Sequence, residues 1–109
     1  GKFDLAQWYW LADFGDPINY LGILTSNNTM NPGKFSDATY DSLIEKAKTA
    51  ANQTDYWKYL RQAEKRLMNQ NGIIPLYYVR ESHLVNPKLS GVEYHVAGFP
   101  DYTRATITK

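Results

Sequence analysis

Two consecutive stretches with apolar residues at helical spacing constrain the fold of this chain more than any other feature. The first is capped by Ser36 or Asp37, and the second is capped by Thr54 and ends at Asn71-Gly72, where Gly72 is predicted to supply the left-handed residue. The apolar positions are Tyr40, Leu43, Ile44, Ala47 and Ala51 in the first stretch, and Trp57, Leu60, Ala63, Leu67 and Met68 in the second. The middle of the chain is therefore predicted to form two amphipathic helices.

Aromatic-rich segments of strand character flank these helices. Phe3–Leu11 predicts a largely buried strand, and Ile73–Val79 predicts another, in which Pro75 favours an edge position or the start of the strand. Weaker strand patterns occur at Ser82–Val85, Val92–Val96 and Thr103–Ile107. Together with a short helix from Pro17 to about Leu24, this order predicts a single α/β or α+β domain with mixed sheet strands and about three helices.

Composition and motifs exclude several classes of function. The net charge of +1, from 12 basic and 11 acidic residues, predicts no nucleic-acid partner. The absence of cysteine excludes zinc thiolate sites and cysteine nucleophiles, and no apolar run is long enough to span a membrane. Neither His83 nor His95 lies near a second histidine or a cysteine in the sequence, and no nucleotide-binding or nucleophile-elbow motif occurs. We therefore predict no enzyme activity, no cofactor and no metal site.

Asp13 is the most informative polar residue, because it directly follows the apolar run Trp8-Tyr9-Trp10-Leu11. Nearby Asp16 already has a structural role as the predicted N-cap before Pro17. One interpretation of Asp13 is a hydrogen bond within its own turn, which aspartate commonly makes. The other is an ionised carboxylate beside apolar walls, which requires a positive partner supplied by a ligand.

The motifs of this chain resemble those of the extracytoplasmic oligopeptide-binding proteins, the solute receptors of peptide ABC transporters (solute-binding protein family 5). The resemblance is carried by "WYWLADFGDPINYL", "SNNTMN", "YDSLIEKA" and "AEKRLMNQNGIIPLYY", in that order. It implies a fragment of the type II periplasmic-binding-protein fold, located outside the cytoplasm as a cell-surface lipoprotein or in the periplasm. Residues 1–91 would be the C-terminal segment of the second ligand-binding lobe, and residues 92–109 would be a tail that crosses back toward the first lobe.

The resemblance also implies roles for five residues. Tyr9 and Leu11 would offer backbone groups to an extended peptide that adds to them as a further strand, and Trp10 would form the wall of a side-chain pocket. Asp13 matches the family position whose carboxylate forms a salt bridge with the peptide's α-ammonium group. Tyr77 is a further candidate ligand contact, and packing against the helices is an equally good interpretation of it. The other implied partner is the membrane permease of the importer.

Two departures from the family pattern affect the expected ligand. Gln7 stands where some members carry a basic residue that holds the peptide's C-terminal carboxylate, and Val79 replaces the third tyrosine of the strand. Gln7 therefore weakens the case for a fixed anchor of the peptide's C-terminus, and Val79 removes one possible polar contact. Because the chain is rich in aromatic residues, a receptor of the same fold for a non-peptide solute such as a sugar or a metal chelate is an alternative, as is a non-catalytic aromatic binding module. We interpret the chain as a piece of a longer protein. In isolation its tail could be disordered, re-pack locally or associate with a second copy.

Overall fold

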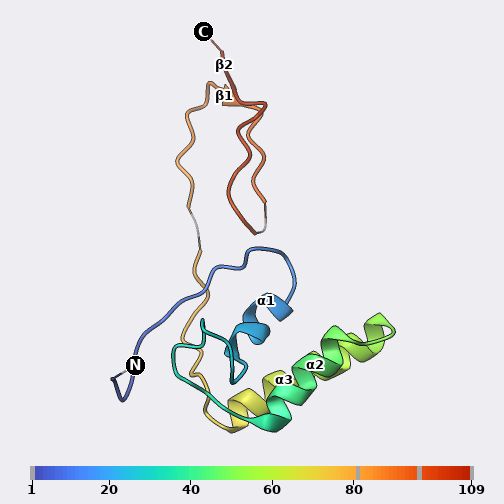
Figure 1. The fold of residues 1–109 in the computed structure, drawn as a ribbon. Helices are drawn as coiled ribbons and strands as arrows, with labels where there is room; N and C mark the ends of the chain where they lie inside the picture. Colours follow the sequence, from blue (N-terminus) through green and yellow to red (C-terminus); the bar gives the residue numbers. More distant parts are fainter. Residues whose placement is uncertain (1, 81, 96, 109) are drawn as a thin grey trace.

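The computed structural model describes residues 2–80, 82–95 and 97–108, and it is elongated. The helices gather in one part of the molecule. The paired segments Leu89–Ser90 and Thr106–Ile107 lie at its far end, and the chain between them runs back toward the helices (Figure 1). The radius of gyration is 18.3 Å and the principal extents are 59 × 40 × 21 Å, whereas a compact domain of this size has a radius of gyration of about 13 Å. None of the described helices has both the length and the apolar character needed to cross a membrane.

The two predicted amphipathic helices are α2 (Ala38–Lys48) and α3 (Gln53–Asn69), which pack against each other. Helix α2 is capped by Asp37, whose carboxylate accepts the Tyr40 backbone N–H at 2.7 Å. Two guanidinium nitrogens of Arg66 also donate to this carboxylate, at 3.0 and 2.7 Å. These hydrogen bonds from Arg66 and Tyr40 lower the pKa of Asp37, and the Arg66 contact joins the end of α3 to the start of α2.

The predicted ends of α3 need correction. Asn52, not Thr54, is the N-cap, because its side-chain oxygen accepts the Asp55 backbone N–H at 2.9 Å. At the other end, the left-handed residue is Asn71, with φ 52°, and not Gly72. The backbone N–H groups of Asn71 and Gly72 donate to the carbonyls of Met68 and Leu67 respectively, which is the Schellman motif. Asn tolerates the left-handed conformation well enough to replace glycine at this position.

The core lies between α2, α3 and the short helices before them. Its fully buried apolar residues are Leu24, Tyr40, Ile44, Ala47, Leu60, Ala63 and Leu67. Six of these seven, all except Leu24, lie on the two predicted apolar stripes. Trp57 is exposed beside the stripe, where its ring contacts Tyr56 edge-on, and Ala51 is exposed beyond the end of α2. Tyr56, half-buried, occupies the core-side position one residue before Trp57.

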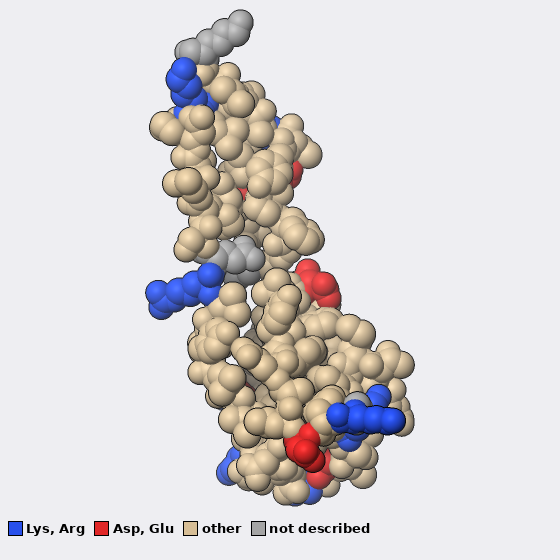
Figure 2. All heavy atoms as spheres, turned by 90° about the vertical axis from the view of Figure 1, so that its left-hand side faces the viewer, with Lys and Arg blue, Asp and Glu red and all other residues tan. Residues whose placement is uncertain are grey.

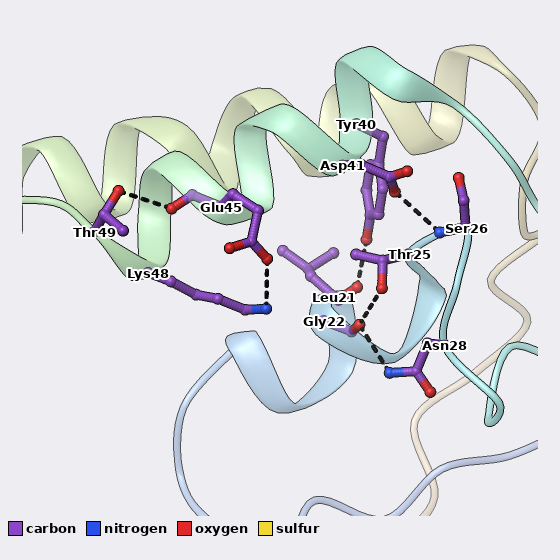
Figure 3. Close-up of polar contacts among 10 residues, drawn as sticks. All are labelled: Leu21, Gly22, Thr25, Ser26, Asn28, Tyr40, Asp41, Glu45, Lys48 and Thr49. Atoms are coloured by element: carbon purple, nitrogen blue, oxygen red, sulfur yellow. Dashed lines mark hydrogen bonds and ion pairs between the residues drawn. The ribbon is translucent and has the colours of Figure 1, made fainter.

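The first helical segment consists of α1 (Ile18–Leu21) and the 3₁₀ helix η1 (Gly22–Leu24). It begins one residue later than predicted, although the Asp16 carboxylate makes the expected capping bond to the Ile18 backbone N–H at 2.9 Å. The buried hydroxyl of Tyr40 on α2 donates to the Leu21 carbonyl at 2.6 Å, and Asp41 of α2 accepts the Ser26 backbone N–H at 3.0 Å (Figure 3). These bonds hold the segment against α2.

The structure contradicts three predicted strands. Among the described residues, no strand forms at Phe3–Leu11, Ile73–Val79 or Ser82–Val85. These stretches lack the ladder hydrogen bonds that define a strand, because a strand requires a partner edge and the described part of the chain supplies none to them. The fold class is therefore three helical segments and a two-stranded antiparallel sheet, with long extended segments outside both.

A short antiparallel pairing joins part of the tail to the residues just before it. Strand β1 (Leu89–Ser90) pairs antiparallel with β2 (Thr106–Ile107), which lies inside the predicted Thr103–Ile107 strand. Of the predicted strand at Val92–Val96, Glu93 forms an isolated bridge with Asp101, and Val96 lies outside the described residues. Gly91 makes this pairing possible: its φ is +77°, and a Cβ there would lie 2.1 Å from the Arg104 carbonyl oxygen.

Gly72 is the position where a single added methyl group should disturb the core most clearly. A Cβ there would lie 2.6 Å from Cδ1 of buried Leu67 and 2.7 Å from Cδ2 of Phe35. We expect Gly72→Ala to lower the free energy of unfolding by about 1–3 kcal/mol because of overpacking. Urea unfolding of the 109-residue chain, followed by circular dichroism, measures this. The control is Gly33→Ala, where no atom lies within 4 Å of the added Cβ; equal effects of the two substitutions would contradict the prediction.

Candidate functional site

The apolar run and Asp13 are brought together by Asn19, a buried residue of α1. The side-chain oxygen of Asn19 accepts the indole N–H of Trp10 at 2.7 Å and the backbone N–H of Asp13 at 3.3 Å. Its side-chain nitrogen lies 3.5 Å from the Asp13 carboxylate, to which it donates. One amide therefore fixes the indole and the loop that follows it.

The Asp13 carboxylate is exposed and almost unoccupied by protein groups. Within residues 2–80, 82–95 and 97–108, its only hydrogen bond is the long one from Asn19. In particular, no backbone N–H of its own loop donates to it there, although a turn role would require such a bond. The Asp13 backbone N–H instead donates to Asn19. The carboxylate is therefore free to bind a cation from outside the described chain.

The other predicted ligand residues differ in their surroundings. Trp10 is half-buried and its ring lies 5.8 Å from that of Trp8, whereas Tyr9 and Leu11 are exposed. The described part of the chain gives the Tyr9–Leu11 backbone no hydrogen-bond partner. Tyr77, with 71% of its surface exposed, does not pack against the helices, and no hydrogen bond or ring contact among the described residues joins it to Trp10 or Asp13. The structure therefore assembles Trp10 and Asp13 and leaves Tyr77 separate.

Asp16 fixes the other end of the same loop. Besides capping α1, its carboxylate accepts a hydrogen bond from the hydroxyl of Tyr56, which projects from α3. Burial, together with this hydrogen bond to Asp16, raises the pKa of Tyr56 to about 12, so the hydroxyl remains a donor at neutral pH. The loop from Asp13 to Pro17 is thus braced by Asn19 at one end and by Tyr56 at the other.

Two shallow, open depressions lie near these residues. One, of about 310 Å³, is bordered by Ala12, Phe14 and Tyr20 among others and adjoins the Asp13 loop without being lined by Asp13 itself. The other, of about 250 Å³, is bordered by Tyr77 with Pro75, Leu76 and Tyr78. Both are lined mainly by apolar groups, and neither is enclosed by the described residues.

Exposed apolar side chains are concentrated in the two extended segments. Ten of the twenty large exposed apolar side chains among the described residues lie there: Phe3, Leu5, Trp8, Tyr9 and Leu11 in the first, and Ile74, Leu76, Tyr77, Tyr78 and Val79 in the second. The others include Leu84 and Phe99, which are almost fully exposed. The face drawn in Figure 2 is correspondingly formed mainly by uncharged residues, with no large patch of one charge. Apolar surface of this extent is typical of an interface with further protein or with a ligand.

One group of side chains in the tail has the composition of a metal site. Glu93, His95 and Asp101 offer ligand atoms that all lie within 4.8 Å of one another. These groups are solvent-accessible and have other partners, since Glu93 lies 3.6 Å from Arg104 and Asp101 accepts the Thr103 backbone N–H at 2.8 Å. That hydrogen bond from Thr103 lowers the pKa of Asp101. We assign no metal to this exposed group.

Asn19 is the site residue that the sequence-based prediction missed. Its signal is an asparagine in the first turn of a short helix otherwise formed by Ile18, Tyr20 and Leu21. Asparagine is unfavourable inside helices because its side chain competes for backbone hydrogen bonds. A polar residue of this kind among apolar neighbours therefore indicates a specific buried partner, although it does not identify Trp10 and Asp13 as that partner.

Comparison with curated proteins finds similarity to solute-binding proteins. The chain is 35% identical over 100 residues to the dipeptide-binding protein DppE of Bacillus subtilis, covering 92% of the chain and 18% of DppE. It is 30% identical over 95 residues to a probable deoxycholate-binding periplasmic protein of Escherichia coli, covering 87% of the chain and 18% of that protein. The chain thus spans less than a fifth of the length of these relatives.

Comparison with solved structures also finds similarity to a segment of a solute receptor. The structure of the pheromone receptor PrgZ, described with its mode of peptide binding, matches with a TM-score of 0.78 and 32% sequence identity. The match covers 92% of this chain and 19% of the receptor. No protein-family model matches the chain. The similarity therefore extends over nearly all of the chain and corresponds to one segment of a much larger binding protein.

Proposed function

Because the chain is homologous to a segment of the extracytoplasmic oligo- and dipeptide-binding proteins of solute-binding protein family 5, we propose that it is part of a peptide receptor that delivers its ligand to an ABC importer. Such relatives are non-catalytic and lie outside the cytoplasm. We accordingly assign the chain a binding role there, either in the periplasm or as a cell-surface lipoprotein, with the membrane permease of the importer as its partner.

The proposed binding mode is strand addition with a charged end point. An extended peptide would bond to the backbone of Tyr9–Leu11, whose N–H and C=O groups have no partner in the described part of the chain. Its α-ammonium group would pair with Asp13, and Trp10 would line a side-chain pocket. Tyr77 would contribute from the second extended segment, where it borders an apolar depression.

The observation that carries this proposal is the exposed, nearly unbonded carboxylate of Asp13 at the end of an extended apolar segment. An ammonium group enclosed in the receptor would lose its hydration and would need both a countercharge and hydrogen-bond acceptors. A carboxylate supplies both in one charge-assisted contact. Because Asp13 is fixed relative to Trp10 through Asn19, the contact would also set the register of the peptide.

The elongated shape and exposed apolar segments are what this assignment requires of residues 1–91. In the parent receptor, these segments would be covered by the rest of the second lobe and by the ligand. Residues 92–109 would cross toward the first lobe. Leu89–Ser90 and Thr106–Ile107 pair at the end of the molecule farthest from the helices, and the chain between them returns toward the helices (Figure 1). The type II periplasmic-binding-protein fold thus remains our proposal for the parent.

A receptor for a non-peptide solute is the second candidate, because one relative is named as a probable deoxycholate-binding protein. Calorimetry on the full-length receptor separates the two, using one peptide with a free amino terminus and the same peptide N-acetylated. We expect acetylation to weaken binding by about 30-fold or more, because it removes the charge that pairs with Asp13. Equal affinities would exclude Asp13 as the ammonium anchor, and binding of neither peptide would favour the non-peptide receptor.

A further inference from the structure

Asn19 has the contacts of a residue that sets the position of a neighbouring charge. Only 8% of its surface is exposed, and a buried side-chain amide has to be satisfied by hydrogen bonds. Its oxygen accepts from the Trp10 indole at 2.7 Å and from the Asp13 backbone at 3.3 Å, and its nitrogen donates to the Asp13 carboxylate. Every one of these bonds ends on a residue of the proposed ligand site.

We propose that Asn19 is the positioning residue of the ammonium anchor, which holds Asp13 at a fixed angle and distance from the Trp10 wall. This inference rests on the function proposed above. The Asn19 nitrogen bonds one oxygen of the Asp13 carboxylate and, within the described residues, leaves the other oxygen for the ligand. Because an amide is neutral, it orients the carboxylate without neutralising it, whereas lysine or arginine at this position would compete with the ligand's ammonium group.

The chemistry of asparagine fits this position specifically. The side chain must accept two hydrogen bonds and donate one, over distances that reach residues six and nine positions earlier. Alanine would leave the Trp10 indole and the Asp13 backbone N–H without an acceptor. Aspartate could keep both accepted bonds, but it would place a second negative oxygen opposite the Asp13 carboxylate.

Asn19 also connects the anchor to the folded core. It lies next to Ile18, whose backbone N–H is bonded to Asp16, and Asp16 is held in turn by Tyr56 of α3. The Leu21 carbonyl at the end of α1 accepts from buried Tyr40 of α2. The amide that positions Asp13 is therefore carried on a helical turn that both long helices hold in place, and a site positioned in this way can discriminate small displacements of a ligand.

A matched control exists in Asn31, the other buried asparagine among the described residues, with 1% of its surface exposed. Its side-chain nitrogen donates to the carbonyls of Thr25 and Phe35 at 3.2 and 2.8 Å, and its oxygen accepts the Phe35 backbone N–H. It is as deeply buried and as fully bonded as Asn19, but it contacts neither Trp10 nor Asp13. A loss that follows merely from removing a buried amide should appear in both variants.

The experiment measures the affinity of the full-length receptor for a free-amine peptide and for its N-acetylated form. The readout is the ratio of the two affinities, which cancels general losses of stability. We expect the free-amine peptide to bind the wild type about 30-fold or more tightly than the acetylated peptide, and we expect this ratio to fall to about 1 in Asp13→Ala. In Asn19→Ala the ratio should be at least about tenfold lower than in the wild type. In Asn31→Ala it should equal the wild-type ratio. A wild-type ratio in Asn19→Ala, with the Asp13 effect intact, would overturn the positioning role alone.

Two further results complete the test. A wild-type ratio near 1 would reject the proposed function itself, which distinguishes that failure from failure of the Asn19 inference. If Asn19→Ala does not fold, Asn19→Asp replaces it, because aspartate retains both accepted bonds. A second carboxylate opposite Asp13 should then change the ratio by about threefold or more, and a ratio equal to that of the wild type would overturn the inference.

Discussion

Replacing Asp13 with alanine is expected to weaken binding of a free-amine peptide to the full-length receptor by about 2–5 kcal/mol, which corresponds to about 30-fold to several thousandfold in affinity. The reason is that the peptide's ammonium group would be enclosed without its countercharge. The described structure gives the Asp13 carboxylate a single long hydrogen bond, from Asn19 at 3.5 Å, so little protein structure depends on it. Stability should therefore change far less than affinity.

Calorimetry on the wild type and the variant measures this effect. Glu45→Gln is the matched control, because it removes one negative charge from an exposed position on α2 whose salt bridge with Lys48 contributes little. The N-acetylated peptide should bind the wild type and Asp13→Ala with similar affinity. A loss below about 1 kcal/mol for the free-amine peptide, with binding otherwise intact, would identify Asp13 as a solvated turn residue.

The helices could be predicted from the sequence because the signals that define them are local. Asp37 caps α2 through the Tyr40 backbone N–H three residues on, and the apolar spacing that follows needs only the helix itself to be interpreted. The errors were also local. Thr54 and Asn52 are both good caps, and the choice between them depends on which backbone is extended, a property that composition does not report.

The strands could not be predicted in the same way, because a strand is defined by its partner. Phe3–Leu11 and Ile73–Val79 have the composition of buried strands, yet neither has a hydrogen-bonded neighbour in the described chain. The β1–β2 pairing was only partly visible in the sequence, since it depends on the close approach of Gly91 to Arg104, thirteen residues away. Pairing over such separations is set by the three-dimensional arrangement rather than by local propensity.

In the candidate site, too, the residue with a local signal could be predicted, whereas the residues that depend on the three-dimensional arrangement could not. Asp13 could be selected from the sequence because a carboxylate directly after an apolar run needs an explanation wherever the chain folds. The contribution of Asn19 depends on α1 turning back over the loop, so that one amide reaches both Trp10 and Asp13. The Tyr56–Asp16 bond depends in addition on where α3 packs, forty residues later.

Tyr40 is the residue whose loss should destabilise the 109-residue chain most, because it combines the largest fully buried side chain with a bond to the site-bearing segment. Its ring contacts Phe35 edge-on at 5.4 Å, and its hydroxyl donates to the Leu21 carbonyl at 2.6 Å (Figure 3). Burial raises the pKa of the hydroxyl, so it remains protonated and keeps donating. We expect Tyr40→Ala to cost about 3–5 kcal/mol in the free energy of unfolding.

Tyr40→Phe isolates the hydroxyl from the ring. It should cost about 1–3 kcal/mol, because the Leu21 carbonyl loses its donor while the packing remains. Urea unfolding monitored by circular dichroism compares both variants with Tyr78→Ala and Tyr78→Phe, whose side chain is 96% exposed and which should change stability by less than about 0.5 kcal/mol. Equal stabilities of wild type and Tyr40→Phe would show that the bond to Leu21 does not hold α1 on the core, and the rigid support inferred for Asn19 and Asp13 would then have to come from Tyr56 and Asp16 alone.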